Sequence, residues 1–212
     1  MAVKKDLSLK YLGVDCLNPF FLSSSPVGGN YDMVAKCYET GWGGCFFKTI
    51  GIFVADECSP RFDQTNKEGL PWIGFKNMEQ ISDKPTEQNF EYVYRLCRDY
   101  PEHITVASIM GSSVDEWKKL AKMADEAGAK IIEGNFSCPQ MTSHDMGSDV
   151  GTNNQLVEEY SRAVAETVPH IPFVAKMTPN CKNMEEHARA ALKVGAAAVS
   201  ATNTIKSITN ID

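Results

Sequence analysis

Apolar runs that follow glycine-terminated amphipathic stretches recur along the sequence. In "YETGWGGCFFKT", "ADEAGAKIIEGN" and "LKVGAAAVSATN", the apolar run begins within about two residues of the glycine. Gly41, Gly128 and Gly195 are therefore expected just after a helix, where the backbone turns left-handed. This alternation predicts β/α units joined into a parallel sheet.

Several of the predicted strands are continuous apolar runs, which are typical of parallel strands covered on both faces. The predicted strands are Phe20–Ser25, Cys45–Ile50, Ile104–Met110, Lys130–Ser137, Pro172–Thr178 and Ala197–Thr204. Between them, Ser113 and Glu116 have the spacing of a helix capping box.

Three predicted helices carry apolar stripes at helical spacing, which we interpret as core. The stripes are Trp117, Leu120, Ala121 and Ala124, then Leu156, Tyr160, Ala163, Val164 and Thr167, and finally Met184, Ala188, Ala191 and Leu192.

Polar residues end nearly every predicted strand, namely Ser24, Lys48, Asn135, Lys176 and Asn203. A barrel brings the carboxyl ends of its strands to one pocket, whereas a Rossmann sheet should show GxGxxG after its first strand, and "SSSPVGGNYD" does not. We therefore predict a (β/α)₈ TIM barrel of which about six βα units are present. Residues 1–212 are expected to be one partial barrel domain, a truncated product or fragment of a longer protein.

Composition favours a small-molecule partner. The net charge is −6 and the basic residues are dispersed, so we expect no binding to nucleic acid or to a membrane surface. No apolar run approaches the roughly 20 residues of a membrane span, and "MAVKKDLSLKYLG" lacks the apolar core of a signal peptide. A cytoplasmic location is expected.

The cysteines are seven, widely spaced and without a CxxC pair. This spacing predicts neither a disulfide framework nor a metal or iron–sulfur cluster. They are Cys16, Cys37, Cys45, Cys58, Cys97, Cys138 and Cys181.

Lys48 and Lys176 follow apolar strands, and each could be a surface lysine whose stem packs on the sheet. A charge at a buried rim is unfavourable unless an anion lies near, and the anionic edge of a reduced flavin would meet that requirement. Asn77, Asn135 and Asn203 could be turn residues, but three carboxamides facing one pocket would match the alternating C=O and N–H edge of a pyrimidine.

Cys138 has four interpretations: a metal ligand, a nucleophile paired with His144, a buried inert thiol, or a general acid or base on a mobile loop. Companion ligands and hydrolase machinery are not evident in the sequence. The position of Cys138 after a strand end and before Pro139 argues against burial. The loop Gln140–Gly151 is long and polar, with Gly147 and Gly151 as hinge candidates, which favours a mobile acid.

An ordered set of short motifs now identifies a family resemblance. "NPFFLSSSP", "KTIG", "FKNMEQI", "ASIMG", "NFSCPQM", "AKMTPN" and "ATNT" resemble motifs of the FMN-dependent dihydroorotate dehydrogenase superfamily, and lean towards its dihydropyrimidine dehydrogenases. The resemblance runs from about residue 6 to the end of the chain and implies the FMN-dependent type of TIM barrel.

The resemblance also implies roles for individual residues. Flavin contacts match Ser24, Lys48, Thr49 and Lys176, and the strip lining the pyrimidine matches Asn77, Asn135, Phe136, Ser137, Asn203 and Thr204. Cys138 matches the catalytic acid, which exchanges a proton with carbon 5 of uracil or thymine while hydride passes between flavin N5 and carbon 6. The loop Gln140–Gly151 would close over the substrate.

Some family features are expected outside these residues. The family holds the FMN phosphate with loops after strands seven and eight, so the isolated chain is expected to have little or no activity. NAD and iron–sulfur clusters are expected only through a missing C-terminal region or a flavin- and NAD-binding partner subunit, in a homo- or hetero-oligomer. The alternatives are a dihydroorotate dehydrogenase, a non-catalytic barrel fragment and a cysteine hydrolase using Cys138 and His144.

Overall fold

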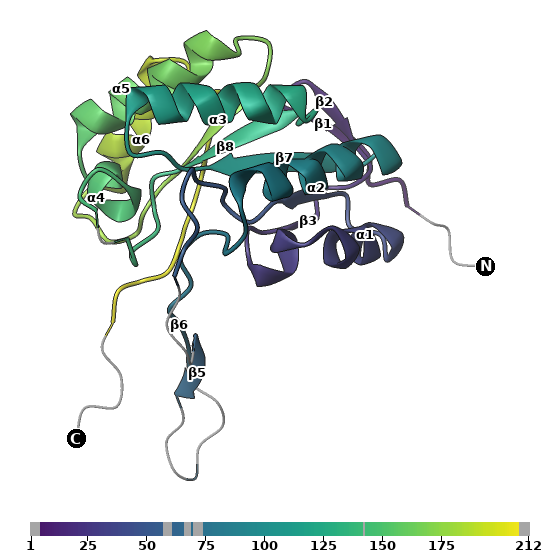
Figure 1. Ribbon diagram of the computed structural model, residues 1–212, viewed down its shortest axis with the longest axis horizontal. Coiled ribbons are helices and arrows are strands. Elements are labelled where there is room, and N and C mark those ends of the chain that lie inside the picture. The colour runs from purple at the N-terminus through teal and green to yellow at the C-terminus, as the bar shows by residue number, and fades with distance from the viewer. Residues whose placement is uncertain (1–4, 57–60, 66–68, 70–73, 142, 208–212) are drawn as a thin grey trace.

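The structure is a computed structural model that describes residues 5–56, 61–65, 69, 74–141 and 143–207. Cys58 therefore lies outside the described residues. A curled parallel sheet forms the centre, and helices cover its outer face (Figure 1). The strands of this sheet are β3 (Phe21–Leu22), β4 (Gly44–Phe46), β7 (Ile104–Ile109), β8 (Ile131–Asn135), β9 (Phe173–Lys176) and β10 (Ala198–Ser200).

The six strands follow one another across the sheet in the order in which they occur in the sequence, from β3 to β10, and every neighbouring pair is parallel. A doubly wound sheet would reverse direction at a switch point, so this order is that of a barrel wall. All six predicted strands are confirmed, although each is shorter than predicted. Their carboxyl ends lie along one rim.

Helices connect consecutive strands on the outside of the sheet. They are the short 3₁₀ helix η1 (Pro26–Gly29), α1 (Tyr31–Glu39), α2 (Thr86–Asp99), α3 (Val114–Glu126), α4 (Gly147–Gly151), α5 (Asn154–Thr167) and α6 (Met184–Lys193). None of the helices described is long and apolar enough to cross a membrane.

The predicted helix ends are found at the expected glycines. Gly41, Gly128 and Gly195 have φ angles of +103°, +81° and +114°, which confirms the left-handed position after α1, α3 and α6. At the start of α3, Ser113 accepts a hydrogen bond from the backbone N–H of Glu116, as predicted. The Glu116 carboxylate binds the backbone N–H and the hydroxyl of Ser112 instead of completing the capping box with Ser113.

The outer face of the sheet packs against the apolar stripes of the helices. The predicted stripe of α3, headed by Trp117, is buried, and the Trp117 ring packs against Phe136 and Tyr160. In α6 the prediction for Leu192 is wrong, because its side chain is 45 % exposed. Ala190 and Ala191 are the buried residues of that helix.

A hairpin that the sequence analysis did not predict closes the inner face of the sheet at the amino ends of the strands. It consists of β1 (Leu9–Tyr11) and β2 (Val14–Cys16), which pair antiparallel. Its apolar side chains pack against inward-facing strand residues in a separate cluster that includes Ile104, Val106, Ile131 and Val174. This cluster is the hydrophobic floor of the barrel interior.

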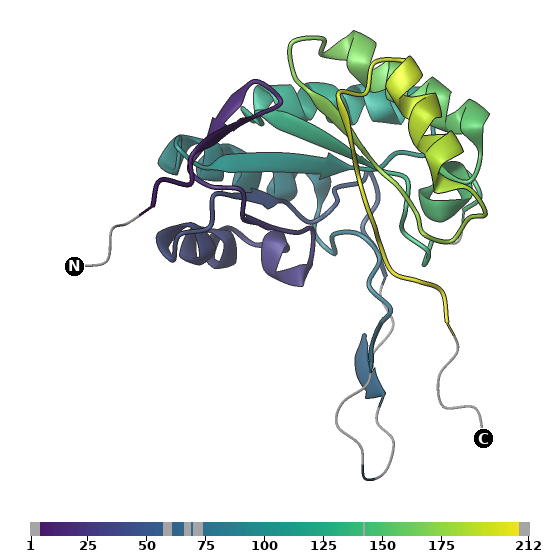
Figure 2. The same ribbon diagram turned by 180° about the vertical axis from the view of Figure 1, so that it is seen from behind.

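A second unpredicted hairpin, β5 (Phe62–Thr65) and β6 (Gly74–Asn77), projects from the opposite end of the molecule. Figure 2 shows it standing away from the sheet on the side where the chain leaves β10. Asn77, predicted in a loop, is the last residue of β6. The hairpin therefore rises from the rim where the parallel strands end.

Gly134 gives a test of the packing between the sheet and the helices. A Cβ atom at this position would lie 2.5 Å from Cζ of Phe173 and 3.3 Å from the Trp117 ring. We expect Gly134→Ala to lower the free energy of unfolding, measured by urea denaturation, by about 1–3 kcal/mol. Phe173→Leu in the same chain should recover part of that loss, and a loss independent of residue 173 would contradict the steric explanation.

Candidate active site

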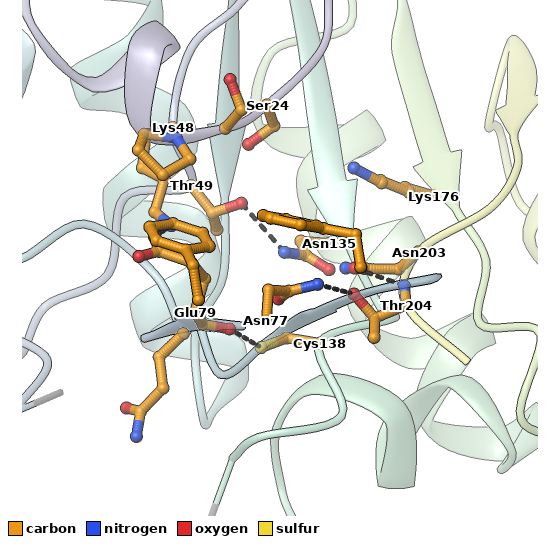
Figure 3. Close-up of a pocket in the computed structure, with 15 residues that line it drawn as sticks. Ser24, Lys48, Thr49, Asn77, Glu79, Asn135, Cys138, Lys176, Asn203 and Thr204 are labelled. Carbon is orange, nitrogen blue, oxygen red and sulfur yellow. Dashed lines mark hydrogen bonds and ion pairs between the residues drawn. The ribbon is translucent and has the colours of Figure 1, made fainter. Parts of the chain in front are cut away.

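The rim at the carboxyl ends of the strands holds a cavity of about 220 Å³. It collects residues from six of the motifs identified in the sequence, and Figure 3 shows their side chains facing one another. The predicted residues that line it are Ser24, Lys48, Thr49, Asn77, Asn135, Cys138, Lys176, Asn203 and Thr204. Nine of the predicted site residues are thus brought together.

Both lysines of the cavity are paired with carboxylates of the same chain. Lys48 is 7 % exposed, and its ammonium binds Glu79 Oε2. Glu79 Oε1 also lies 3.4 Å from Arg61. Lys176 Nζ lies 3.9 Å from Oε1 of the buried Glu133. The argument that these lysines require a bound anion is therefore wrong, since each has an internal counter-charge.

Hydrogen bonds connect the polar side chains of neighbouring strand ends. Asn135 Nδ2 donates to Thr49 Oγ1 over 2.9 Å, and Asn135 Oδ1 accepts from the Ser137 hydroxyl over 2.7 Å. Asn203 Nδ2 donates to Ser137 Oγ over 3.0 Å. Thr49, Asn135 and Ser137 are all buried, so their partners fix their orientation.

The β5–β6 hairpin is tied to the segment after β10. Asn77 Nδ2 donates to Thr204 Oγ1 over 3.0 Å, although 127 residues separate the two in sequence. Asn180 Nδ2 in turn donates to the backbone carbonyl of Thr204 over 2.9 Å. Phe62 and Phe75 of the hairpin stack with ring centroids 5.7 Å apart and line the cavity as well. The hairpin thus forms one wall of the site.

Cys138 lies in the cavity wall but is 2 % exposed, so the expectation that its position prevents burial is wrong. Its Sγ lies 4.0 Å from the backbone carbonyl of Glu79. Its own carbonyl accepts a hydrogen bond of 2.9 Å from the backbone N–H of Ser148 in α4. The Cys138 thiol is therefore held between the loop after β6 and helix α4.

The loop after Cys138 is anchored by the glycines that were predicted as hinges. A Cβ atom on Gly147 would lie 2.3 Å from the carbonyl oxygen of Cys138, and one on Gly151 would lie 1.9 Å from that of Phe136. Both glycines are buried in α4, so they allow close packing against the Cys138 segment. Residues 139–141 and 143–146 are the part of the loop with half-buried or exposed side chains.

Phe136 differs from the other predicted substrate contacts. Its side chain is fully buried against the rings of Trp117 and Phe173, on the helix-covered face of the sheet, and it does not line the cavity. The reason is the alternation of side chains along a strand, because Asn135 points inward. Ser137 does not line the cavity either, but it contacts Asn135 and Asn203, which do.

The alternative roles of Cys138 find little support in the geometry. The His144 side chain is 94 % exposed and binds Asp149 over 2.6 Å, so it is oriented towards solvent and not into the cavity. Among the described residues, no group of three or more His, Cys, Asp or Glu side chains is placed to bind a metal ion.

Other cysteines lie in environments that keep the thiol protonated. Burial raises the pKa of Cys97 to about 11. Burial also raises the pKa of Cys45, beneath η1, and of Cys16 in the β1–β2 hairpin. These thiols are inert core residues, whereas Cys138 lines the cavity.

Two carboxylates of the site were missed by the sequence analysis. Glu79 stands two residues after Asn77 within the quoted motif "FKNMEQI", and the need to pair Lys48 was the available signal. Glu133 shares the inward face of its strand with Asn135, two residues away, which the period of a strand would have indicated. Phe62 and Phe75 gave no signal because their hairpin was not predicted.

The chain resembles known proteins in family, in sequence and in structure. The family model described as dihydroorotate dehydrogenase matches residues 6–212. NAD-dependent dihydropyrimidine dehydrogenase subunit PreA of Escherichia coli K12 is 57 % identical over 208 residues, which are 98 % of this chain and 50 % of the relative. The chloroplastic dihydropyrimidine dehydrogenase (NADP(+)) of Arabidopsis thaliana is 34 % identical over 216 residues, with the same coverage.

Two proteins of lower sequence identity also match most of the chain. The catalytic subunit of dihydroorotate dehydrogenase B (NAD(+)) from Pyrococcus abyssi is 30 % identical, covering 95 % of this chain and 64 % of the relative. The crystal structure of DHODH from Eimeria tenella in complex with ferulenol superposes with a TM-score of 0.77 at 14 % identity, covering 94 % of this chain and 60 % of that one. The chain spans half the length of the E. coli and Arabidopsis relatives. With the strand order of a barrel wall, these matches show that the chain belongs to the dihydroorotate dehydrogenase family.

Proposed function

We propose that this chain provides the substrate-binding and proton-transferring part of an FMN-dependent dihydropyrimidine dehydrogenase, which interconverts uracil or thymine and the 5,6-dihydropyrimidine. The observation that carries the proposal is the convergence of Cys138 with three asparagine carboxamides and two lysines on one cavity. The match to dihydropyrimidine dehydrogenases over nearly the whole chain supports it.

The residues present fit the ring of a flavin. Lys48, Asn135 and Lys176 offer ammonium and amide donors at neighbouring strand ends, beside the Thr49 hydroxyl, and the carbonyl and nitrogen edge of a flavin accepts such donors. At Gly29 in η1, a Cβ atom would lie 3.0 Å from Cβ of Lys48, so the backbone approaches the site closely. Bound FMN would supply the hydride chemistry at carbon 6 of the base.

Cys138 would provide the proton. In the reducing direction its thiol gives a proton to carbon 5 of the base, and in the oxidising direction its thiolate removes that proton. The carbonyl of Glu79 and the packing of α4 hold the side chain at the cavity wall, and Phe62 and Phe75 cover the cavity from the hairpin. These contacts keep the acid in place and restrict access of water.

The charges of the cavity favour a neutral base over dihydroorotate. Glu79 lines the cavity, while Lys48 and Lys176 are each paired with a carboxylate. The carboxylate of dihydroorotate would have to compete with Glu79 and Glu133 for these two ammonium groups, whereas a neutral base leaves both ion pairs intact. We therefore place uracil and thymine ahead of dihydroorotate as substrates.

The proposal includes a partner subunit. The E. coli relative is, by its name, a subunit of an NAD-dependent dihydropyrimidine dehydrogenase, in which electrons would pass between the flavin and a nicotinamide. We infer that NAD and iron–sulfur clusters would act through such a partner or through the part of the relatives that this chain does not span.

Replacing Cys138 tests the assigned proton transfer. In a complete, flavin-loaded version of the protein, Cys138→Ala should slow flavin reduction by dihydrouracil by about 10²–10⁴-fold, because the general acid or base is lost. The flavin absorbance spectrum should remain. Cys37→Ala, a half-buried cysteine of α1 outside the cavity, serves as the control and should leave the rate unchanged.

Other outcomes of the same experiment would point elsewhere. A folded protein that binds neither flavin nor pyrimidine would favour the non-catalytic barrel fragment. If the chain instead catalyses a hydrolysis without flavin, and His144→Ala abolishes that activity, the cysteine hydrolase would be favoured. Reduction by dihydroorotate at a higher rate than by dihydrouracil would overturn the assigned substrate class.

Gly151→Ala tests whether α4 positions Cys138. The added methyl group would collide with the carbonyl oxygen of Phe136, so α4 and the bond from Ser148 to Cys138 must move. We expect turnover with dihydrouracil to fall by about 10²-fold, as misplacement of a reacting group by about 1 Å does. Thr152→Ala, at the exposed next residue, is the control, and equal rates in the two variants would show that α4 does not position the thiol.

A further inference from the structure

We propose that Glu133 is a positioning residue that fixes the direction of the Ser108 and Thr49 hydroxyl bonds and so keeps Thr49 an acceptor for the Asn135 NH₂ group in the cavity. The buried carboxylate is the end of a series of hydrogen bonds that runs through both asparagines, here called the inner hydrogen-bond network. This inference rests on the proposed function for the identity of the ligand, but not for the direction of the hydrogen bonds.

Glu133 lies inside the barrel, one layer below the cavity. Its strand, β8, turns Ile131, Glu133 and Asn135 to the same face, so the interior changes from the hydrophobic floor to a carboxylate and then to the cavity wall. The side chain is 2 % exposed. A carboxylate removed from water in this way must be compensated by neighbouring groups.

Those neighbours are two hydroxyls and an ammonium. Ser108 Oγ donates to Glu133 Oε1 and Ser200 Oγ donates to Glu133 Oε2, each over 2.9 Å. The ammonium of Lys176 lies 3.9 Å from Oε1. A carboxylate surrounded by two hydroxyls and this cation accepts hydrogen bonds and donates none.

This restriction sets the direction of the next two bonds. The Ser108 hydroxyl has one proton, and it is used for Glu133, so the 2.9 Å bond between Thr49 Oγ1 and Ser108 Oγ must be donated by Thr49. The Thr49 hydroxyl then has no proton left for Asn135. It accepts, and the group of Asn135 that faces it over 2.9 Å is therefore the NH₂ group.

A main-chain donor fixes the other side of Asn135. The backbone N–H of Ser137 can only donate, so the atom that accepts it over 3.0 Å is Oδ1, which also accepts from the Ser137 hydroxyl over 2.7 Å. The Ser137 proton is used in that bond, so Ser137 Oγ accepts from Asn203 Nδ2 over 3.0 Å, and the orientation of the Asn203 amide is held by the backbone N–H of Thr204, which donates to Oδ1 over 2.7 Å. Every bond of the network thus donates in the direction of Glu133.

The direction decides what a ligand meets. Each NH₂ group has two protons, and the network uses one of each, which leaves one N–H on Asn135 and one on Asn203. Both side chains line the cavity, so these two donors are available to ligand carbonyl oxygens. Rotating either amide would present an acceptor instead. The network therefore favours a base with carbonyl groups, such as uracil, over one with an exocyclic amino group, such as cytosine.

The test observes the amide groups directly. We would label the full chain with ¹⁵N-asparagine and record the side-chain NH₂ signals, assigned by their loss in Asn135→Asp and Asn203→Asp. Glu133→Gln should shift or double the Asn135 signals, because its amide can donate to Ser108 and so let the Ser108 and Thr49 hydroxyls turn towards Asn135. The Asn203 signals should stay, because the backbone N–H of Thr204 holds that amide. Glu133→Asp, which keeps the charge, should restore a single set.

Two serine variants separate the network from general loss of packing. Ser108→Ala interrupts the series and should move the Asn135 signals. Ser200→Ala removes a donor to the same carboxylate outside the series and should leave them in place. Equal effects of the two variants, or unchanged signals in a folded Glu133→Gln protein, would overturn the proposal.

Ligand selectivity gives the second measurement. In the flavin-loaded protein, the preference for uracil over cytosine should be at least about tenfold and should fall several-fold in Ser108→Ala. An unchanged preference would overturn the specificity role. If the wild-type protein binds neither base, the proposed function fails, while the amide signals still decide whether Glu133 directs the network.

Discussion

Polar side chains on the inner face of the curled sheet have to be paired within the protein, because they are removed from bulk water. Below the rim, the β1–β2 hairpin fills the interior with apolar side chains, and the first polar layer above it is built around Glu133. Lys176 and two serines compensate that carboxylate, and Glu79 compensates Lys48 in the same way. The geometry of the cavity follows from this pairing, since each partner restricts the orientation of the next.

The sequence could predict the fold because the relevant signals are local. Glycines at the ends of helices and the apolar runs after them define three of the six strands without knowledge of their neighbours, and the other three are recognisable from their own residues. The polar strand ends likewise predicted most of the site, because parallel strands bring their carboxyl ends to one rim. The hairpins were missed because β5 is polar and β1 and β2 are short, so neither has the apolar pattern of a central strand.

The errors in the site have a different origin. Phe136 was assigned to the pocket as part of a contiguous motif, although the alternation along β8 and beyond places it opposite Asn135. The same alternation pointed to Glu133 and was not used. Glu79 lies 31 residues from Lys48, so this pairing is tertiary and cannot be inferred from spacing. The sequence likewise does not disclose the carbonyl groups that approach Gly147 and Gly151 in α4.

The site combines determinants of two kinds. Thr49 and Asn135, with Ser108 and Glu133 beneath them, are buried at or near strands, so a change in one alters the hydrogen bonds of the others. Asn77 comes from a projecting hairpin, and Cys138 from a loop beyond its strand. Positions of the second kind can change with less effect on the core, because loops tolerate substitution better than buried networks do. Differences among members of the family should therefore arise at the loops and the hairpin, while the network beneath them preserves the donors of Asn135 and Asn203.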